Sequence, residues 1–167
     1  MSKIAVNTHL AGAAGTVAGA VITRLLGGKT DVIMMLNGAL AGLVAITAEP
    51  LTPSPMLAIF IGAVGSIIMY FGTKMLENFG LDDVVGAIPV HMFAGIFGTL
   101  VVPLSNMDTS FGTQFMGVVS VVAFSFIISY GVFSALKATV GLRISKEAER
   151  LGTDKAEVGV VAYSIRD

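Results

Sequence analysis

The chain alternates between long apolar stretches and short polar connections. Five stretches are predominantly apolar, and they cover residues 4–26, 32–48, 56–75, 84–104 and 115–136. All five exceed the usual strand length of about 3–10 residues, so we expect helices despite the many valines and isoleucines. About 20 helical residues cross the roughly 30 Å hydrocarbon core of a bilayer. The pattern therefore predicts an all-α, polytopic helical membrane bundle with about five transmembrane helices.

The basic residues are unevenly distributed between the connections. Lysine and arginine occur in the first and third connections and in the tail, whereas the second and fourth connections contain none. Cytoplasmic loops of membrane proteins carry such an excess of basic residues. We therefore expect a multi-pass protein of the inner or plasma membrane, with its N-terminus outside and its C-terminus in the cytoplasm. Residues 1–136 would form the transmembrane bundle and residues 137–167 a cytoplasmic tail.

The composition narrows the possible chemistry. Hydrophobic residues make up 54% of the chain and charged residues 13%, and the mean hydropathy is +0.86. A formal net charge of −1 gives no electrostatic basis for binding nucleic acid. The chain has no cysteine and only two histidines, so we expect no disulfide, no metal site and no cofactor. The spans contain neither paired carboxylates nor a nucleophile beside a base, which argues against an enzyme.

The fourth stretch carries a histidine near its middle. Asp82 and Asp83 open this stretch, and no further charged residue follows until Asp108. An ionisable side chain at that depth is costly, which makes His91 a candidate for a substrate pathway. A neutral, buried histidine bonded to a neighbouring helix is the alternative. Small residues at helical offsets from His91 would leave room for another helix, namely Ala87, Ala94, Gly95 and Gly98.

Other polar residues also interrupt the spans. For Asn37 we favour an interhelical hydrogen bond over a contact with substrate. His9 follows Asn7 and Thr8 near the outer end of the first span, and we interpret it as an interfacial residue rather than part of a vestibule. In the tail, Ser145 is predicted to cap a short helix. This tail is either simply solvated or a docking surface for a soluble partner.

Three segments resemble the ammonium transporter / Rhesus protein family. Residues 37–47, NGALAGLVAIT, resemble the family's N-G-x-x-A-G-L-V-x-I-T helix. Residues 82–91, DDVVGAIPVH, continue through Gly95 and GTL at 98–100, and resemble its D-D segment that ends in V-H. VGLR at 140–143 resembles its cytoplasmic tail, together with Glu147, Glu149, Arg150, Gly152, Ala162 and Tyr163. The resemblance covers almost the whole chain in the expected order.

The resemblance implies a trimer of eleven-helix subunits, each with its own pore built from two inverted five-helix repeats and a last helix. This chain would correspond to the C-terminal part, and His91 to the second of two hydrogen-bonded pore histidines. The first histidine, the outer aromatic recruitment site and the phenylalanine gate lie upstream in the family. The positions matching structural residues of the pore helices are Asp82, Asp83, Asn37, Gly95 and Gly98, and those of a regulatory tail are Gly141, Leu142, Arg143 and Tyr163.

The function implied by the resemblance is transmembrane transport of ammonium or ammonia. Ammonium would lose a proton at the outer end, and ammonia would pass a narrow apolar pore that is incomplete without the N-terminal helices. The expected partners are membrane lipid, ammonium or ammonia, and either two further copies or a chain that supplies those helices. A soluble nitrogen-regulatory protein at the tail is also implied, although the family's His-Gly-Glu reads VGVV at 158–161 here. A non-transporting interaction subunit or an inert truncated product are the alternatives.

Overall fold

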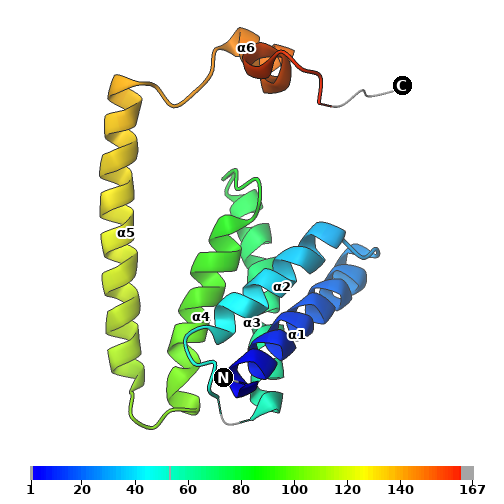
Figure 1. Cartoon of the computed structure of the whole chain (residues 1–167), viewed down its shortest axis with the longest axis vertical. Helices are drawn as coiled ribbons and strands as arrows, with labels where there is room; N and C mark the ends of the chain where they lie inside the picture. The colour runs from blue at the N-terminus through cyan, green and yellow to red at the C-terminus, as the bar shows by residue number, and fades with distance from the viewer. Residues whose placement is uncertain (1, 53, 163–167) are drawn as a thin grey trace. The chain divides into compact units, whose positions relative to one another are not determined.

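The computed structural model describes residues 2–52 and 54–162, and all of its regular structure is helical (Figure 1). The elements are α1 (Ser2–Gly27), α2 (Val32–Ile46), α3 (Pro55–Asn78), the π-helical turn η1 (Ile88–Phe93), α4 (Ala94–Val101), the 3-10 turn η2 (Val102–Leu104), α5 (Phe111–Thr139), α6 (Lys146–Leu151) and the π-helical turn η3 (Asp154–Val158). Because η1, α4 and η2 follow one another without a break, each of the five predicted spans is present. The predicted all-α membrane bundle is confirmed.

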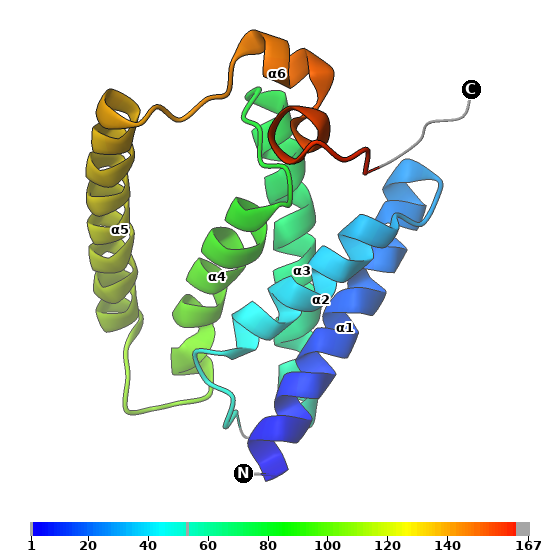
Figure 2. The same ribbon diagram turned by 45° about the horizontal axis from the view of Figure 1, so that its top comes forward.

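The five spans differ in length. Among the described residues, α1, α3 and α5 are long and apolar enough to cross a membrane. Helix α2 has 15 residues, and the fourth segment extends only from Ile88 to Leu104. Helix α2 lies beside α1, α3 and α4 (Figure 2). These helices cover one face of α2, and its other face carries the exposed side chains of Ile33, Leu36 and Leu40.

The chain divides into two compact units, Met1–Ser120 and Val121–Asp167. The first unit contains α1 to η2 and the beginning of α5. The second contains the rest of α5, α6 and η3. Helix α5 is apolar on all sides, as expected of a helix that crosses a bilayer. Its last turn closes at Gly141, whose φ of +85° suits a glycine and whose N–H bonds the Leu136 carbonyl at 2.9 Å.

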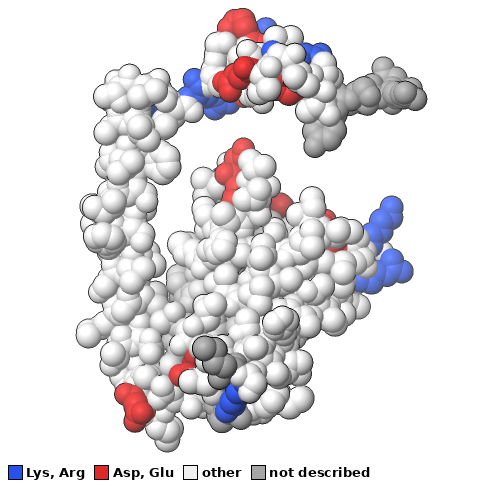
Figure 3. Space-filling view, viewed as in Figure 1, with Lys and Arg blue, Asp and Glu red and all other residues white. Residues whose placement is uncertain are grey.

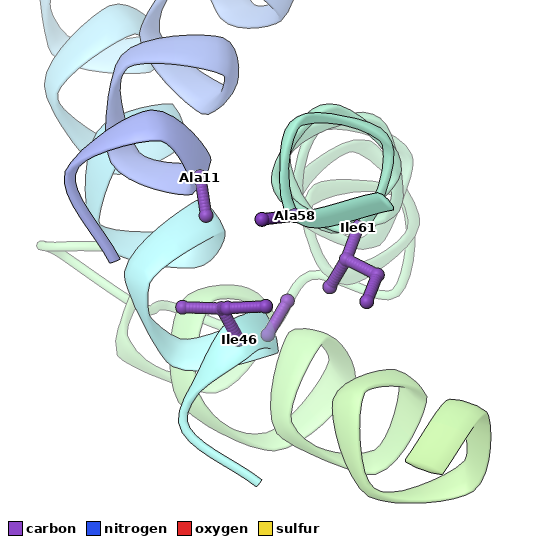
Figure 4. Close-up of a cluster of buried hydrophobic side chains, with 5 residues drawn as sticks. Ala11, Ile46, Ala58 and Ile61 are labelled. Atoms are coloured by element: carbon purple, nitrogen blue, oxygen red, sulfur yellow. The ribbon is translucent and has the colours of Figure 1, made fainter. Parts of the chain in front are cut away.

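The core of the first unit is built from small side chains. Ala11 of α1, Ile46 of α2, and Ala58 and Ile61 of α3 converge and are almost fully buried (Figure 4). Two of these four side chains are single methyl groups, so the helix axes can come close together. Lipid provides no hydrophobic drive for helix association, and close backbone contact provides the packing energy in its place.

Glycines bring the backbones of four helices into direct contact. A methyl group on Gly42 of α2 or on Gly62 of α3 would overlap the Ala11 carbonyl of α1. A methyl group on Gly98 of α4 would overlap the Ala45 carbonyl of α2. The predicted close approach of another helix at a small residue is thus confirmed for Gly98, and Gly42 makes a similar contact with α1.

Side chains from two other segments of the chain hydrogen-bond to the α2–α3 connection. The Asn7 side chain of α1 is fully buried, and its Nδ2 donates to the carbonyls of Pro50 at 3.0 Å and Thr52 at 3.1 Å. From the loop after α4, Asn106 Nδ2 donates to a Glu49 carboxylate oxygen at 3.1 Å. The polar residue near the start of α1 therefore anchors a loop, which satisfies backbone carbonyls where water is scarce.

The close contact at Gly98 yields a prediction with a matched control. Gly98→Ala should lower the thermal midpoint of the detergent-purified protein by several degrees, because overpacking a dense core costs about 1–3 kcal/mol. Gly95→Ala, on the same helix, places its methyl 3.6 Å from Val44 Cγ1 in ordinary contact. The control carries the same gain in helix propensity, about 1 kcal/mol. Size-exclusion melting curves measure both variants, and equal midpoints would contradict the packing described for Gly98.

Candidate functional site

The fourth membrane segment begins at a carboxylate cap. Asp83 Oδ1 accepts the Ala87 N–H at 2.8 Å, and Asp83 Oδ2 accepts the Ile88 N–H at 2.7 Å. The first N–H groups of a helix have no partner within the helix, and a carboxylate at this end also interacts favourably with the helix dipole. Pro89 follows, and its missing N–H removes one further donor from the same turn. Asp83 thus fixes the point at which the helix starts.

A side chain from α2 holds the turn before this helix. Asn37 Nδ2 donates to the Val85 carbonyl at 3.0 Å. The next residue, Gly86, has a φ of +72°, and a methyl group there would lie 2.8 Å from the Asn37 Nδ2. The expected hydrogen bond of Asn37 is therefore present, but its acceptor lies in the connecting turn rather than in another helix. The bond links α2 to the entrance of the fourth segment.

The predicted start of the fourth helix at residue 84 is wrong. Regular helix begins at Ile88, because Asp83 and Gly86 shape a turn over the preceding residues. The first turn from Ile88 to Phe93 is π-helical. Such turns are uncommon and occur often at functional sites.

His91 lies inside this π-helical turn, and its side chain is exposed in the structure. Ile88 and Met92 are also exposed, each with 39% of its surface accessible. No hydrogen bond of the His91 ring was found to the part of the chain that the structure describes. The alternative of a buried histidine bonded to a neighbouring helix therefore does not hold within this chain. His91, Ile88 and Met92 form an apolar face with one imidazole, here called the His91 face.

The opposite side of the same helix is packed. Val90, Ala94 and Gly98 are buried, and Val90 and Ala94 join a cluster with Ala41 of α2 and Met69 of α3. We predicted that Ala94 and Gly98 would share the surface of His91, and this prediction is wrong. A π-helical turn contains more residues than an α-helical one, so the α-helical offsets of three and seven no longer define one face. Gly95 is only half-buried, on the side between the two.

Helix α3 supports the histidine-bearing turn from behind. A methyl group on Gly72 would collide with the Phe93 ring and lie 3.4 Å from Pro89 Cβ. Pro89 is buried at this contact. The absence of a side chain at residue 72 lets the turn settle against α3 and directs His91 to the other side. Nothing in the spacing of Gly72 within α3 indicated this role.

The two acidic residues that open the segment differ in their hydrogen bonds. Asp83 makes the two cap bonds, whereas Asp82 is exposed and no hydrogen bond of its side chain was found among the described residues. Both line a cavity of about 250 Å³ that also includes Glu77 and Thr73 of α3. Among the described residues, no group of three or more metal-ligating side chains was found. The candidate site thus combines the His91 face with Asp83, the carboxylate that caps the same helix.

The tail residues singled out in the sequence are organised locally. The predicted cap is confirmed, since Ser145 Oγ accepts the Ala148 N–H of α6 at 3.1 Å. Arg143 pairs with Glu149 at 2.8 Å, and this hydrogen bond raises the pKa of the guanidinium. Leu142 is exposed. Tyr163 lies outside the described residues.

A second carboxylate organises the end of the tail. Asp154 Oδ2 accepts the Ala162 N–H at 3.0 Å, and this bond, above all, lowers the pKa of the Asp154 carboxyl. Gly152 and Gly159 flank η3 with φ values of +94° and +73°. Residues 145–162 of the tail therefore form a short series of capped turns rather than an extended segment.

Comparison with known proteins matches residues 1–163 to the model of the Ammonium Transporter Family. The chain is 40% identical to "Ammonium transporter Amt2" of Archaeoglobus fulgidus, over 98% of this chain and 39% of that protein. It is 33% identical to "Ammonium transporter Amt1" of Haloferax mediterranei, over 98% of this chain and 33% of that protein. The chain thus spans about a third to two fifths of the length of these relatives.

Solved structures agree with these relatives. A "Sensor Amt Protein" superimposes with a TM-score of 0.86 at 28% identity, over 93% of this chain and 42% of that chain. The crystal structure of Candida albicans Mep2 superimposes with a TM-score of 0.80 at 25% identity, over 95% of this chain and 40% of that chain. The resemblance predicted from the three sequence segments is confirmed, and the chain belongs to the ammonium transporter family.

Proposed function

We propose that the His91 face forms one wall of a transmembrane pathway for ammonium or ammonia. The observation that carries the proposal is an exposed imidazole in the first turn of the apolar segment Ile88–Leu104, flanked by apolar side chains, in a member of this family. An ionisable side chain within a membrane segment is costly in contact with lipid, and such residues usually face a pathway. The relatives named above are called ammonium transporters, which supports ammonium or ammonia as the cargo.

The chemistry of the His91 face suits a neutral nitrogen compound. A neutral imidazole has one N–H donor and one acceptor nitrogen. Ammonia can accept from the first and donate to the second. The apolar neighbours Ile88 and Met92 provide no ligands that would replace the water around a cation, so an ammonium ion would pay a much larger desolvation cost than ammonia. Because of this difference in desolvation cost, ammonium would lose a proton before it enters the apolar part of the pathway. The proposal concerns transport, and no catalysed covalent reaction is part of it.

A second wall must face His91 for the pathway to exclude lipid. In transporters built from inverted repeats, the substrate site lies at the interface between the repeats. The chain spans only part of the length of its relatives, and the helices from the remainder of such a protein would supply that wall. We infer an assembly with those helices, and a trimer of the completed unit. An interaction subunit without transport has no specific observation in its favour.

The proposal also covers the orientation of the chain in the membrane and its regulation through the tail. The distribution of basic residues favours a cytoplasmic tail and a plasma-membrane or inner-membrane location. The tail then offers its capped turns to a soluble partner. One of the similar structures is a "Sensor Amt Protein", and this supports a regulatory role for some proteins of this fold.

The proposal is tested by flux through liposomes. The purified chain alone should give no saturable ammonium-driven current or internal alkalinisation, and co-assembly with the helices that complete the family's fold should restore both. In that assembly, His91→Ala should reduce flux or ammonium selectivity at least tenfold while assembly remains intact. His9→Ala is the control, because His9 is exposed and its Nδ1 lies 2.7 Å from the Ala5 carbonyl of its own helix, the one side-chain hydrogen bond found for it within the described residues. Unchanged flux in His91→Ala would overturn the proposal.

The cap provides a separate prediction about positioning. Asp83→Asn replaces one of the two carboxylate oxygens that accept a backbone N–H by an NH₂ group, which cannot accept. Leaving that N–H without a partner lowers the free energy of unfolding by roughly 1–3 kcal/mol. The thermal midpoint and the flux should both fall. Asp82→Asn removes the same charge from the neighbouring residue and should change neither by a comparable amount. Equal effects of the two variants would indicate that charge, rather than the cap, matters.

Topology can be tested with single cysteines, since the chain contains none. Cysteine in place of Ser110 should react with an impermeant maleimide in intact cells, because this connection should face outside. Cysteine in place of Ser145 should react only after permeabilisation. The reverse labelling pattern would contradict the orientation.

A further inference from the structure

The direction of His91 depends on the helical register of the turn that contains it. In an α-helix, with about 3.6 residues per turn, Ala94 and Gly98 would lie within about 60° of His91 around the helix axis. In the structure Ala94 and Gly98 are buried, whereas His91 is exposed. The π-helical turn η1 therefore rotates His91 away from the packed side, and a return to the α-helical register would rotate it back.

The hydrogen bonds at the end of η1 show this register directly. The Ala94 N–H donates to the carbonyls of Pro89 and His91, five and three residues earlier in the chain. An α-helix would use the carbonyl four residues earlier. Because π-helical turns are rare, contacts outside the turn must stabilise it against the α-helical register.

The start of the turn is fixed by the carboxylate of Asp83, whose two oxygens accept the N–H groups of Ala87 and Ile88. Figure 3 shows acidic side chains, in red, at the loop between α3 and the fourth segment. Residues 84–107 contain no Asp, Glu, Lys or Arg. Charged contacts can therefore fix where the turn begins, but the direction of the residues that follow depends on packing.

The end of the turn packs against a glycine of α3. A methyl group on Gly72 would overlap the Phe93 ring and lie 3.4 Å from Pro89 Cβ. Pro89, near the beginning of η1, and Phe93, at its end, therefore border the same space, which the lack of a side chain at residue 72 leaves open. The register of a helix sets the angle between two of its side chains around the axis. A contact that holds both Pro89 and Phe93 thus also holds the register.

We propose that Phe93, packed against Gly72, is a positioning residue that keeps η1 in the π-helical register and His91 on the exposed side. The consequence for transport rests on the function proposed above for the His91 face. A larger residue at position 72, or a smaller one at position 93, releases the turn. The α-helical register then moves the imidazole toward Ala94 and Gly98, and the His91 face loses its polar group.

Modification of His91 by diethyl pyrocarbonate measures the exposure of its ring in the purified full chain in detergent. Mass spectrometry follows the reaction, and His9, which is exposed in α1, is the internal reference. Gly72→Ala and Phe93→Ala should each slow the modification of His91 relative to His9 about fivefold or more, as when the exposed register is occupied at most about a fifth of the time. The first variant overpacks the contact and the second empties it, so a common result does not depend on one kind of packing defect.

Gly65→Ala is the matched control on the same helix, because its methyl group would lie 2.8 Å from Ala45 Cβ, toward α2 rather than η1. This variant should lower the thermal midpoint, since it also overpacks a helix contact, and leave the modification rate of His91 unchanged. A wild-type rate in Gly72→Ala or in Phe93→Ala would overturn the proposal. An equal slowing in Gly65→Ala would also overturn it, because the effect would then reflect general loosening of the helices.

The positioning role and the transport role of His91 can fail separately. In the complete assembly, Gly72→Ala and Phe93→Ala should reduce ammonium flux in the same direction as His91→Ala. Slower modification with unchanged flux would support the positioning of His91 by Phe93 and contradict the proposed role of His91 in transport. Reduced flux with a wild-type modification rate would contradict the positioning alone.

Discussion

The structure depends on direct contact between helix backbones. Gly42 and Gly62 both approach the Ala11 carbonyl, and Gly98 approaches the Ala45 carbonyl. In water, large apolar side chains would associate these helices through the hydrophobic effect, but lipid tails are as apolar as the side chains themselves. Association then depends on close dispersion contacts, which small residues allow. These contacts bring the four helices together, and the further contact of Gly72 with Phe93 and Pro89 directs His91 outward.

Polar side chains complete this framework by satisfying backbone groups at helix ends. Asn7 donates to two carbonyls of the α2–α3 connection, Asn37 to the Val85 carbonyl, and Asp83 accepts two N–H groups at the start of η1. Each of them bonds to the main chain. Unpaired backbone groups are costly in a membrane, so these side chains determine where helices can begin and connections can turn. As a result of this arrangement, one side of the fourth segment packs against α2 and α3, and the His91 face on the other side is exposed.

Much of this arrangement is readable in the sequence, because length and hydropathy reflect the bilayer directly. The five spans, the cap by Ser145 and the small-residue contact at Gly98 were all predicted. The start of the fourth helix was not, since the effect of Asp83 depends on which N–H groups its carboxylate reaches in three dimensions. The separation of Ala94 from the surface of His91 depends on a π-helical turn that hydrophobic periodicity does not reveal. The role of Gly72 depends on Phe93, which lies on another helix.

The central claim is that the His91 face borders a protein-lined pathway rather than lipid. Photo-crosslinking from a diazirine residue at Met92, on the His91 face, tests it in the complete assembly in membranes. We expect adducts with polypeptide segments outside the 167 residues of this chain. A diazirine residue at Phe97, which packs against the buried cluster of Ala11 and Ile46, should give crosslinks within the chain. Adducts of position 92 with lipid alone would contradict the account.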